Sequence, residues 1–367
     1  MGGPLPYDRV MGGDDLVARV PDLIARMPKA ELHLHLDGSL RPSTALALAR
    51  QRGLDEGMDL PAMERRLRAP AQASDQAELL AAFDLPIAIM QDAEALYRVA
   101  HELVEDVATD GTRYVEIRWG PLLHVQRGLH LGDGIAAVAA GVHDACAATG
   151  VVARLIAVAL RSHPPEANAV MARTAAGFID QGLTGFDLAG VEEAFPDPLV
   201  HARAFDIARE AGLGITVHAG EWGGAAQVRR ALEVRPARLA HGAPAAADPL
   251  LVDEIKARGV TLDLCPTSSV QASVFPTLAD FPLRRLLHAG VPITLSTDDR
   301  TLSDLTLVRE YHRAVGVLGL TPRELWAINL HALRVAFLEH DEAARAGLIA
   351  DFQGFAASER SLEGPAS

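Results

Sequence analysis

The chain has 367 residues, of which 49% are hydrophobic and 22% charged, and its formal net charge is −14. This length and composition exclude a disulfide-stabilised miniprotein and a chain that is disordered over most of its length. The acidic balance argues against nucleic acid and anionic membranes as partners. Two cysteines, Cys146 and Cys265, and the absence of an apolar signal segment or transmembrane run indicate a cytoplasmic protein.

Eight short, apolar, β-rich segments alternate with helix-like stretches along the chain. The predicted strands cover residues 31–36, 113–119, 151–160, 183–188, 214–219, 238–241, 261–265 and 292–297. Helical patterns lie between most of them, for example over 199–211 and 251–258. Alternating strands and helices predict a parallel sheet. Eight such units favour an α/β fold of the (β/α)8 TIM barrel type, with an interior filled by branched apolar residues.

The connection between the first two strands is much longer than the others. Its pattern is helical, with clear segments at 77–83 and 93–109. An insertion after the first barrel strand emerges at the catalytic face, so we expect residues 37–112 to form a helical cap. Packing against the barrel wall is the alternative for any one of its residues. We therefore predict a single domain over 1–367, folded over 14–350, with loose termini at 1–13 and 358–367.

The first predicted strand carries His33, His35 and Asp37 in alternation with leucines. Residues two apart in a strand share a face, so these three side chains point the same way. Two imidazoles on one face form half of a zinc site. The alternative is a pair of hydrogen-bonded core histidines, and the motif alone does not decide between them.

Other polar residues follow the later strands. His218 ends the fifth strand with Glu221 just beyond it, His241 ends the sixth, and Asp298 and Asp299 end the eighth. Each has a structural alternative: a packing histidine, or an acidic pair that caps the next helix. The C-terminal ends of barrel strands meet at one mouth, however, so together these groups predict a hydrolytic metal site. The candidate ligands are His33, His35, His218 and Asp298.

In combination these segments resemble the adenosine deaminase family, the zinc-dependent purine deaminases of the metal-hydrolase barrels. The resemblance runs from about residue 28 to 337. It rests on the segments ELHLHLDGSLRP, RYVEIRWGP, GFDLAG, TVHAGE, LAHG, CPTS and STDD, each at or after a predicted strand, and on the capping segment LLAAFDLPIAIMQ.

The resemblance implies a role for each matching position. His33, His35, His218 and Asp298 match the ligands of one Zn2+ per chain. Glu221 matches the acid that protonates N1 of the purine, and His241 matches the residue that orients the hydroxide nucleophile. The positions that match substrate-binding residues are His35, Asp37 on the ribose side, Gly190 at N3 and Asp299 at N7.

Three positions depart from the family pattern. Arg300 stands where many members have proline, Ser269 where bacterial members usually have asparagine, and Val191 where an acid is common. All three lie in loops around the expected pocket. None of them removes a predicted ligand, so the departures bear on the periphery of the substrate.

The implied activity is hydrolytic deamination of adenosine and 2′-deoxyadenosine to inosine and ammonia, with a small purine nucleoside as partner and a homo-oligomer left open. The close alternatives are adenine or a 5′-substituted adenosine such as aminodeoxyfutalosine. Asp37 before Gly38 favours a nucleoside, since adenine-specific relatives usually carry glutamate there. Two other classes remain: a different metal-dependent hydrolase on the same barrel, and a catalytically silent nucleoside-binding relative.

Overall fold

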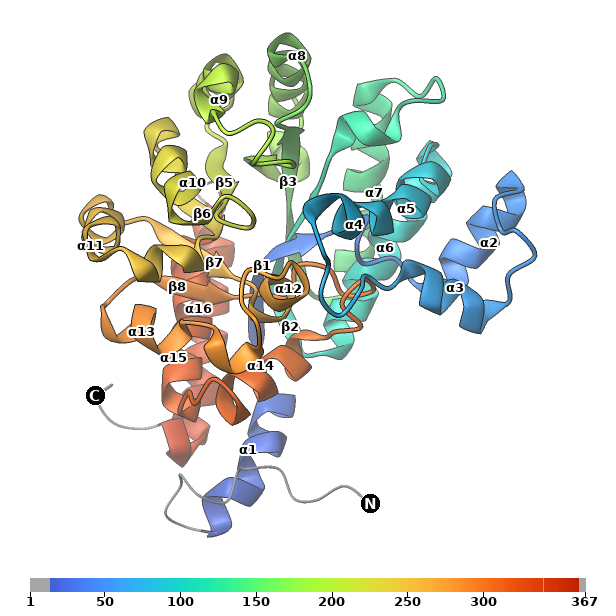
Figure 1. The fold of residues 1–367 in the computed structure, drawn as a ribbon. Coiled ribbons are helices and arrows are strands. Elements are labelled where there is room, and N and C mark those ends of the chain that lie inside the picture. The colour runs from blue at the N-terminus through green and yellow to red at the C-terminus, as the bar shows by residue number, and fades with distance from the viewer. Residues whose placement is uncertain (1–13, 339, 363–367) are drawn as a thin grey trace.

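The computed structural model describes residues 14–338 and 340–362, and its centre is an eight-stranded parallel sheet. The strands are β1 (Lys29–His35), β2 (Thr112–Trp119), β3 (Val152–Leu160), β4 (Leu183–Ala189), β5 (Gly214–Ala219), β6 (Arg238–His241), β7 (Thr261–Leu264) and β8 (Ile293–Leu295). They are hydrogen-bonded in sequence order (Figure 1). All eight predicted strands are present, and the predicted (β/α)8 barrel is confirmed.

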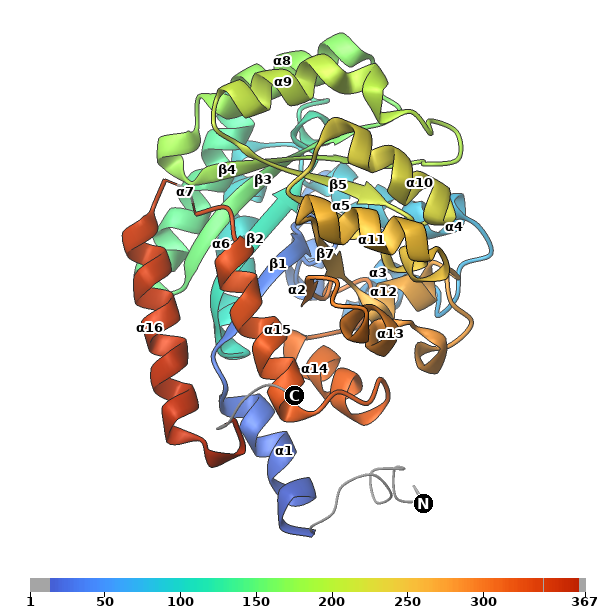
Figure 2. The same cartoon turned by 90° about the vertical axis from the view of Figure 1, so that its left-hand side faces the viewer.

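Helices surround the strands (Figure 2). Those after β2 are α7 (Leu131–Thr149), α8 (Pro165–Ala176), α9 (Ala202–Glu210), α10 (Gly224–Ala231), α11 (Pro249–Arg258), α12 (Pro266–Gln271), α13 (Leu283–His288), α14 (Leu307–Gly316), α15 (Pro322–Val335) and α16 (Glu342–Ser358). The N-terminal helix α1 (Asp14–Arg26) lies near α14, α15 and α16 in both views. Among the described residues, no helix combines the length and apolarity needed to cross a bilayer.

Only part of the predicted loose termini falls within the described residues. Of the predicted loose termini, residues 1–13 and 363–367 lie outside the described residues. Residues 358–362 complete α16 and form the short 3-10 helix η9 (Arg360–Leu362), in which Leu362 is buried.

The barrel closes between β1 and the segment that follows β8. The backbone N–H of His35 donates to the carbonyl of Asp298 at 2.7 Å, and the N–H of Asp298 donates to the carbonyl of His33 at 3.1 Å. Asp298 adopts a left-handed backbone conformation, with φ of 68°, which is uncommon outside glycine and concentrates at functional sites. Closure of the barrel therefore places two histidines and an aspartate side by side.

The barrel interior is polar, so the prediction of a branched apolar interior is wrong. Arg238 of β6 forms hydrogen-bonded ion pairs with Glu116 of β2 and with Asp263 of β7, and all three side chains are fully buried. Since β2 and β6 are not neighbours in the sheet, this pair spans the inside of the barrel. The apolar residues that alternate with them, such as Val115 and Ile117, belong to the hydrophobic core instead.

Five α-helices lie between β1 and β2, namely α2 (Pro42–Arg52), α3 (Leu60–Leu67), α4 (Gln76–Leu80), α5 (Asp84–Ile89) and α6 (Ala93–Thr109), and the 3-10 helix η2 (Ala81–Phe83) joins α4 to α5. The segment between α3 and α4 is hydrogen-bonded to the end of α12, which follows β7, and to the loop after β8. The N–H of Ala69 donates to Leu302 O at 3.0 Å, and the N–H of Ala73 donates to Gln271 O at 2.7 Å. The insertion is thereby attached at the C-terminal ends of the strands.

Candidate metal centre and active site

Three imidazoles and a carboxylate converge at the mouth of the barrel. His35 Nε2 lies 3.2 Å from each of His33 Nε2, His218 Nε2 and Asp298 Oδ1, and His33 Nε2 lies 2.9 Å from the same Asp298 oxygen. β1 presents His33 and His35 on one face, β5 presents His218, and barrel closure supplies Asp298. The four side chains predicted from the sequence as candidate ligands therefore lie in contact with one another at the mouth of the barrel.

The spacing of these four donor atoms suits one divalent ion. Four ligands arranged tetrahedrally about Zn2+ at its usual bond lengths lie about 3.3 Å apart, close to the separations above. Nitrogen and oxygen donors of this kind are ordinary zinc ligands. The residues thus fit a metal without rearrangement.

His241 lies beside this set at a slightly larger distance. Its ligand atom is within 4.8 Å of those of His33, His218 and Asp298, but its Nε2 is 3.8 Å from Asp298 Oδ2 and 3.9 Å from Glu221 Oε1. Neither ring nitrogen has a hydrogen-bond partner among the described residues, although the ring is buried. Such orphaned donors and acceptors indicate a ligand. We place His241 next to the four candidate ligands rather than among them.

Two further carboxylates each have a buried oxygen without a hydrogen-bond partner among the described residues. Asp299 Oδ1 and Asp37 Oδ1 have no hydrogen-bond partner within the described part of the chain. Gly38 makes room for the first, because a Cβ at this position would lie 1.6 Å from Asp299 Oδ1. Asp37 lies beyond the end of β1, so the predicted strand alternation stops at His35.

The buried charges divide the carboxylates into two kinds. Burial raises the pKa of Glu221 well above its ordinary value, and the nearby Asp298 charge raises it further. Burial and the Asp298 charge likewise raise the pKa of Asp299 well above its usual range. Burial opposes ionisation of Asp298 too, but His33 and His35 outweigh it and hold the pKa of Asp298 well below its usual range. One carboxylate is thus kept as an anion and two as acids.

The surroundings of His33, His218 and His241 favour the neutral form of each ring. Burial lowers the pKa of His33 well below its usual value and that of His218 in the same direction. Burial also lowers the pKa of His241 to about 3. Only neutral imidazole offers a lone pair to a metal or accepts a hydrogen bond from water.

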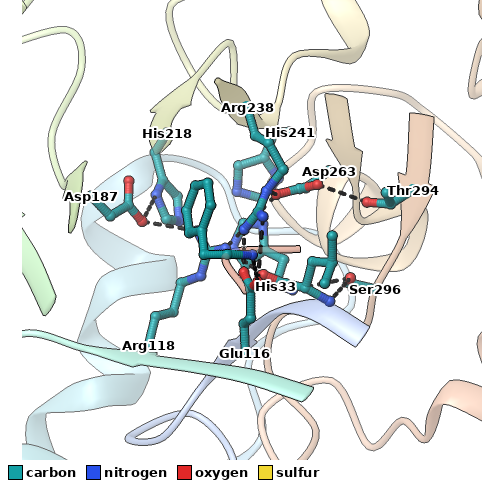
Figure 3. Close-up of polar contacts among 12 residues, drawn as sticks. His33, Glu116, Arg118, Asp187, His218, Arg238, His241, Asp263, Thr294 and Ser296 are labelled. Atoms are coloured by element: carbon teal, nitrogen blue, oxygen red, sulfur yellow. Dashed lines mark hydrogen bonds and ion pairs between the residues drawn. The ribbon is translucent and has the colours of Figure 1, made fainter. Parts of the chain in front are cut away.

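Asp187 and Ser268 contact two of the candidate ligands, and sequence reasoning assigned neither of them a role. Asp187 Oδ2 lies 2.9 Å from His218 Nδ1 and accepts a hydrogen bond from Arg118 at 2.9 Å (Figure 3). Ser268 Oγ donates to Asp298 Oδ2 at 2.6 Å. A buried acid in β4, pointing to the same barrel end as His218, was the available signal for Asp187.

Glu192 fixes the turn that carries Glu221, which sequence reasoning also missed. Its Oε2 accepts the backbone N–H groups of Trp222 at 3.1 Å and Gly223 at 2.7 Å. Glu192 is fully buried and follows β4 closely in sequence. It therefore holds the two residues immediately after the candidate acid.

The remaining predicted positions differ in their surroundings, and the prediction that Arg300, Ser269 and Val191 all lie in loops around the pocket is met only in part. Gly190 follows β4 with φ of 104°, a conformation that L side chains rarely adopt. Arg300 binds Asp110 Oδ2 at 2.6 Å, so it is tied to the turn before β2. Ser269 is buried in α12, and Val191 is partly exposed after Gly190.

Comparisons with known proteins agree with this geometry. The family model described as adenosine deaminase matches residues 28–351. A protein of Enterococcus faecalis named adenosine deaminase is 33% identical over 87% of this chain and 94% of its own length. One of Mycobacterium avium with the same name is 36% identical over 87% and 93%.

Solved structures lead to the same family. An adenine deaminase from Arthrobacter aurescens superimposes with a TM-score of 0.82 and 26% identity, covering 90% of this chain and 99% of that one. An Arabidopsis N6-mAMP deaminase gives 0.81 and 26%, covering 91% and 99%. With its barrel and its mouth of histidines and carboxylates, the chain belongs to the adenosine deaminase family.

Proposed function

We propose that this chain catalyses the hydrolytic deamination of adenosine and 2′-deoxyadenosine to inosine or 2′-deoxyinosine and ammonia. The observation that carries the proposal is the convergence of His33, His35, His218 and Asp298 within 3.2 Å contacts, beside an acid, Glu221, that is held protonated. The relatives named adenosine deaminase support the same activity.

We assign the four donor residues as ligands of one Zn2+ per chain. Zn2+ in such a site supplies Lewis acidity that makes water nucleophilic near neutral pH. His241, neutral and without a partner, is placed to accept a hydrogen bond from the attacking water. Asp298 Oδ2 lies 3.8 Å from His241 Nε2 and accepts a hydrogen bond from Ser268 Oγ.

Glu221 and Asp299 act on the purine ring. N1 and N7 of adenine are hydrogen-bond acceptors, so a partner at either position must carry a proton, and the raised pKa of each carboxyl group meets this need. Proton donation from Glu221 to N1 makes C6 electrophilic. Water adds its oxygen at C6 and gives up two protons, one to the amine and one to Glu221, which replaces the proton it gave to N1. The C6–N bond then breaks, ammonia leaves and the 6-oxo purine remains.

Several further features belong to the same proposal. The unpartnered Asp37 Oδ1 suits a sugar hydroxyl and would repel a 5′-phosphate, which favours a nucleoside. Gly190 would present its N–H to N3. Residues 37–112 would act as a cap over the mouth, supported by the hydrogen bonds of Ala69 and Ala73. Two free cysteines support a reducing, cytoplasmic environment.

A panel of substrates tests the proposal. Purified protein is assayed for ammonia release from adenosine, 2′-deoxyadenosine, adenine, adenosine 5′-monophosphate and a 5′-substituted adenosine, each with and without a chelator. We expect release from the first two, with the rate abolished by the chelator and restored by Zn2+. Release from adenine alone, or from the 5′-substituted compound alone, would replace adenosine with that substrate. Release from none of them would refute the proposed function.

A further inference from the structure

His124 is a fully buried histidine that the activity above leaves without a role. It ends the 3-10 helix η3 (Pro121–His124), which follows β2. Its Nδ1 lies 3.1 Å from the carbonyl oxygen of Met90, and its Nε2 lies 3.4 Å from Asp37 Oδ2. Both partners accept hydrogen bonds, so the ring is placed to donate to either of them. The ring therefore contacts Asp37 from one side and the inserted helices from the other.

The two oxygens of Asp37 have different surroundings. Oδ2 faces His124, whereas Oδ1 is buried without a hydrogen-bond partner among the described residues. Only 4% of Asp37 is exposed. A carboxylate that turned about its Cβ–Cγ bond would exchange these oxygens or lose the His124 contact. The pairing of Oδ2 thus determines where Oδ1 points.

The backbone around His124 is itself held in place. Gln91 Nε2 donates to Leu123 O at 2.7 Å and to Ile87 O at 2.8 Å, and Gln91 Oε1 accepts the N–H of Gln126 at 2.9 Å. These bonds join the end of α5 to η3 on both sides of His124. A rotation of the ring would break its contacts with Met90 and with Asp37.

We propose that His124 is a positioning residue of the sugar side of the site, which holds Asp37 so that its free oxygen accepts one hydroxyl of the nucleoside sugar. This inference rests on the proposed function. It adds a contact from η3 to a carboxylate that alone would be free to turn. The recognised group is a neutral hydroxyl, because an anion at Asp37 would be repelled.

The test compares adenosine with its 2′-, 3′- and 5′-deoxy analogues as substrates for the wild type, His124→Phe and His124→Gln. Wild-type deamination of adenosine is measured first, and its absence would refute the proposed function rather than this inference. For His124→Phe we expect kcat/KM to fall about 10- to 100-fold, the range for a hydrogen bond to a charged group, mainly through KM. The analogue that lacks the recognised hydroxyl should lose less than about 3-fold. His124→Gln keeps one donor and should lose less on the other substrates.

Melting temperature and metal content are measured for each variant. His331→Phe is the matched control, since His331 is another partly buried histidine, bound to Thr261 at the start of β7, far from Asp37 in the barrel. It should affect all four substrates alike. Equal losses on all four substrates for His124→Phe, or no loss on any, would overturn the inference. If His124→Phe fails to fold, the same comparison with His124→Gln decides.

Discussion

Two layers of buried polar side chains occupy the inside of this barrel, and they differ in how their hydrogen bonds are satisfied. In the lower layer, Glu116 accepts hydrogen bonds from Tyr114, Arg238 and the N–H of Phe337, while Asp263 accepts from Arg238 and Thr294. In the upper layer, at the mouth, ring nitrogens and carboxylate oxygens remain without partners within the described residues. Figure 3 shows both layers together.

This difference in hydrogen bonding indicates that the lower layer stabilises the fold and that the upper layer binds ligands. A buried ion pair whose atoms are all bonded has little left to offer a ligand, and removing one member leaves an uncompensated charge. Buried groups without partners are costly, and they persist where a ligand completes them. Mutations in the lower layer should therefore cost stability, and mutations at the mouth should cost activity or metal binding.

The largest expected effect on activity comes from Glu221→Gln. Glutamine keeps the shape but cannot donate the proton to N1, so kcat should fall about 10²- to 10⁴-fold. In the wild type, kcat/KM should decline as pH rises through the raised pKa of Glu221, since the proton is then lost, and the variant should lack this decline. Steady-state kinetics between pH 5 and 9 test both points. Near-normal turnover of the variant would contradict the assigned role.

Arg238→Met should destabilise the protein instead. It leaves Glu116 and Asp263 buried without their cation, which typically costs about 3–5 kcal/mol of unfolding free energy. Denaturant unfolding measures this change. The metal content of the folded fraction should stay at the wild-type value, because the hydrogen bonds and ion pairs of the Arg238 side chain within the described residues go to Glu116, Asp263 and Val335 and not to the four candidate ligands. A loss of metal with unchanged stability would contradict the division into two layers.

Asp187→Asn tests the boundary between the two layers. Asp187 contacts Arg118 on one side and the candidate ligand His218 on the other. Asparagine is nearly the same size but bears no charge to orient the imidazole. Loss of such a partner typically weakens metal affinity about 10- to 100-fold. Competition with a metal-binding dye measures the affinity directly. A metal affinity equal to that of the wild type would show that Asp187 does not orient the His218 imidazole for metal binding.

The strand order and most of the mouth could be predicted from the sequence. β-rich segments recur eight times, and polar residues at their ends stand out against leucine and valine. Alternation in β1 was enough to put His33 and His35 on one face, and the structure places them there. The resemblance of the motifs to the adenosine deaminase family then indicated which of these polar residues belong to the candidate site.

The polar interior could not be predicted with the rule used for barrels. In β2, Glu116 and Arg118 alternate with Val115 and Ile117, so the sequence shows one polar face but does not say which face is inside. The partners of Arg238 come from β2 and β7, and the pairing depends on the three-dimensional register. His124 gave no signal, because its partners lie 87 and 34 residues away.

Metal content is the most direct test of the central claim that the four donor residues bind one ion. Elemental analysis of the purified full chain, of His218→Ala and of the control His331→Ala measures it. We predict roughly one divalent ion per chain in the wild type and control, and near-complete loss in His218→Ala with the fold retained by circular dichroism. An unchanged metal content in His218→Ala would contradict the account.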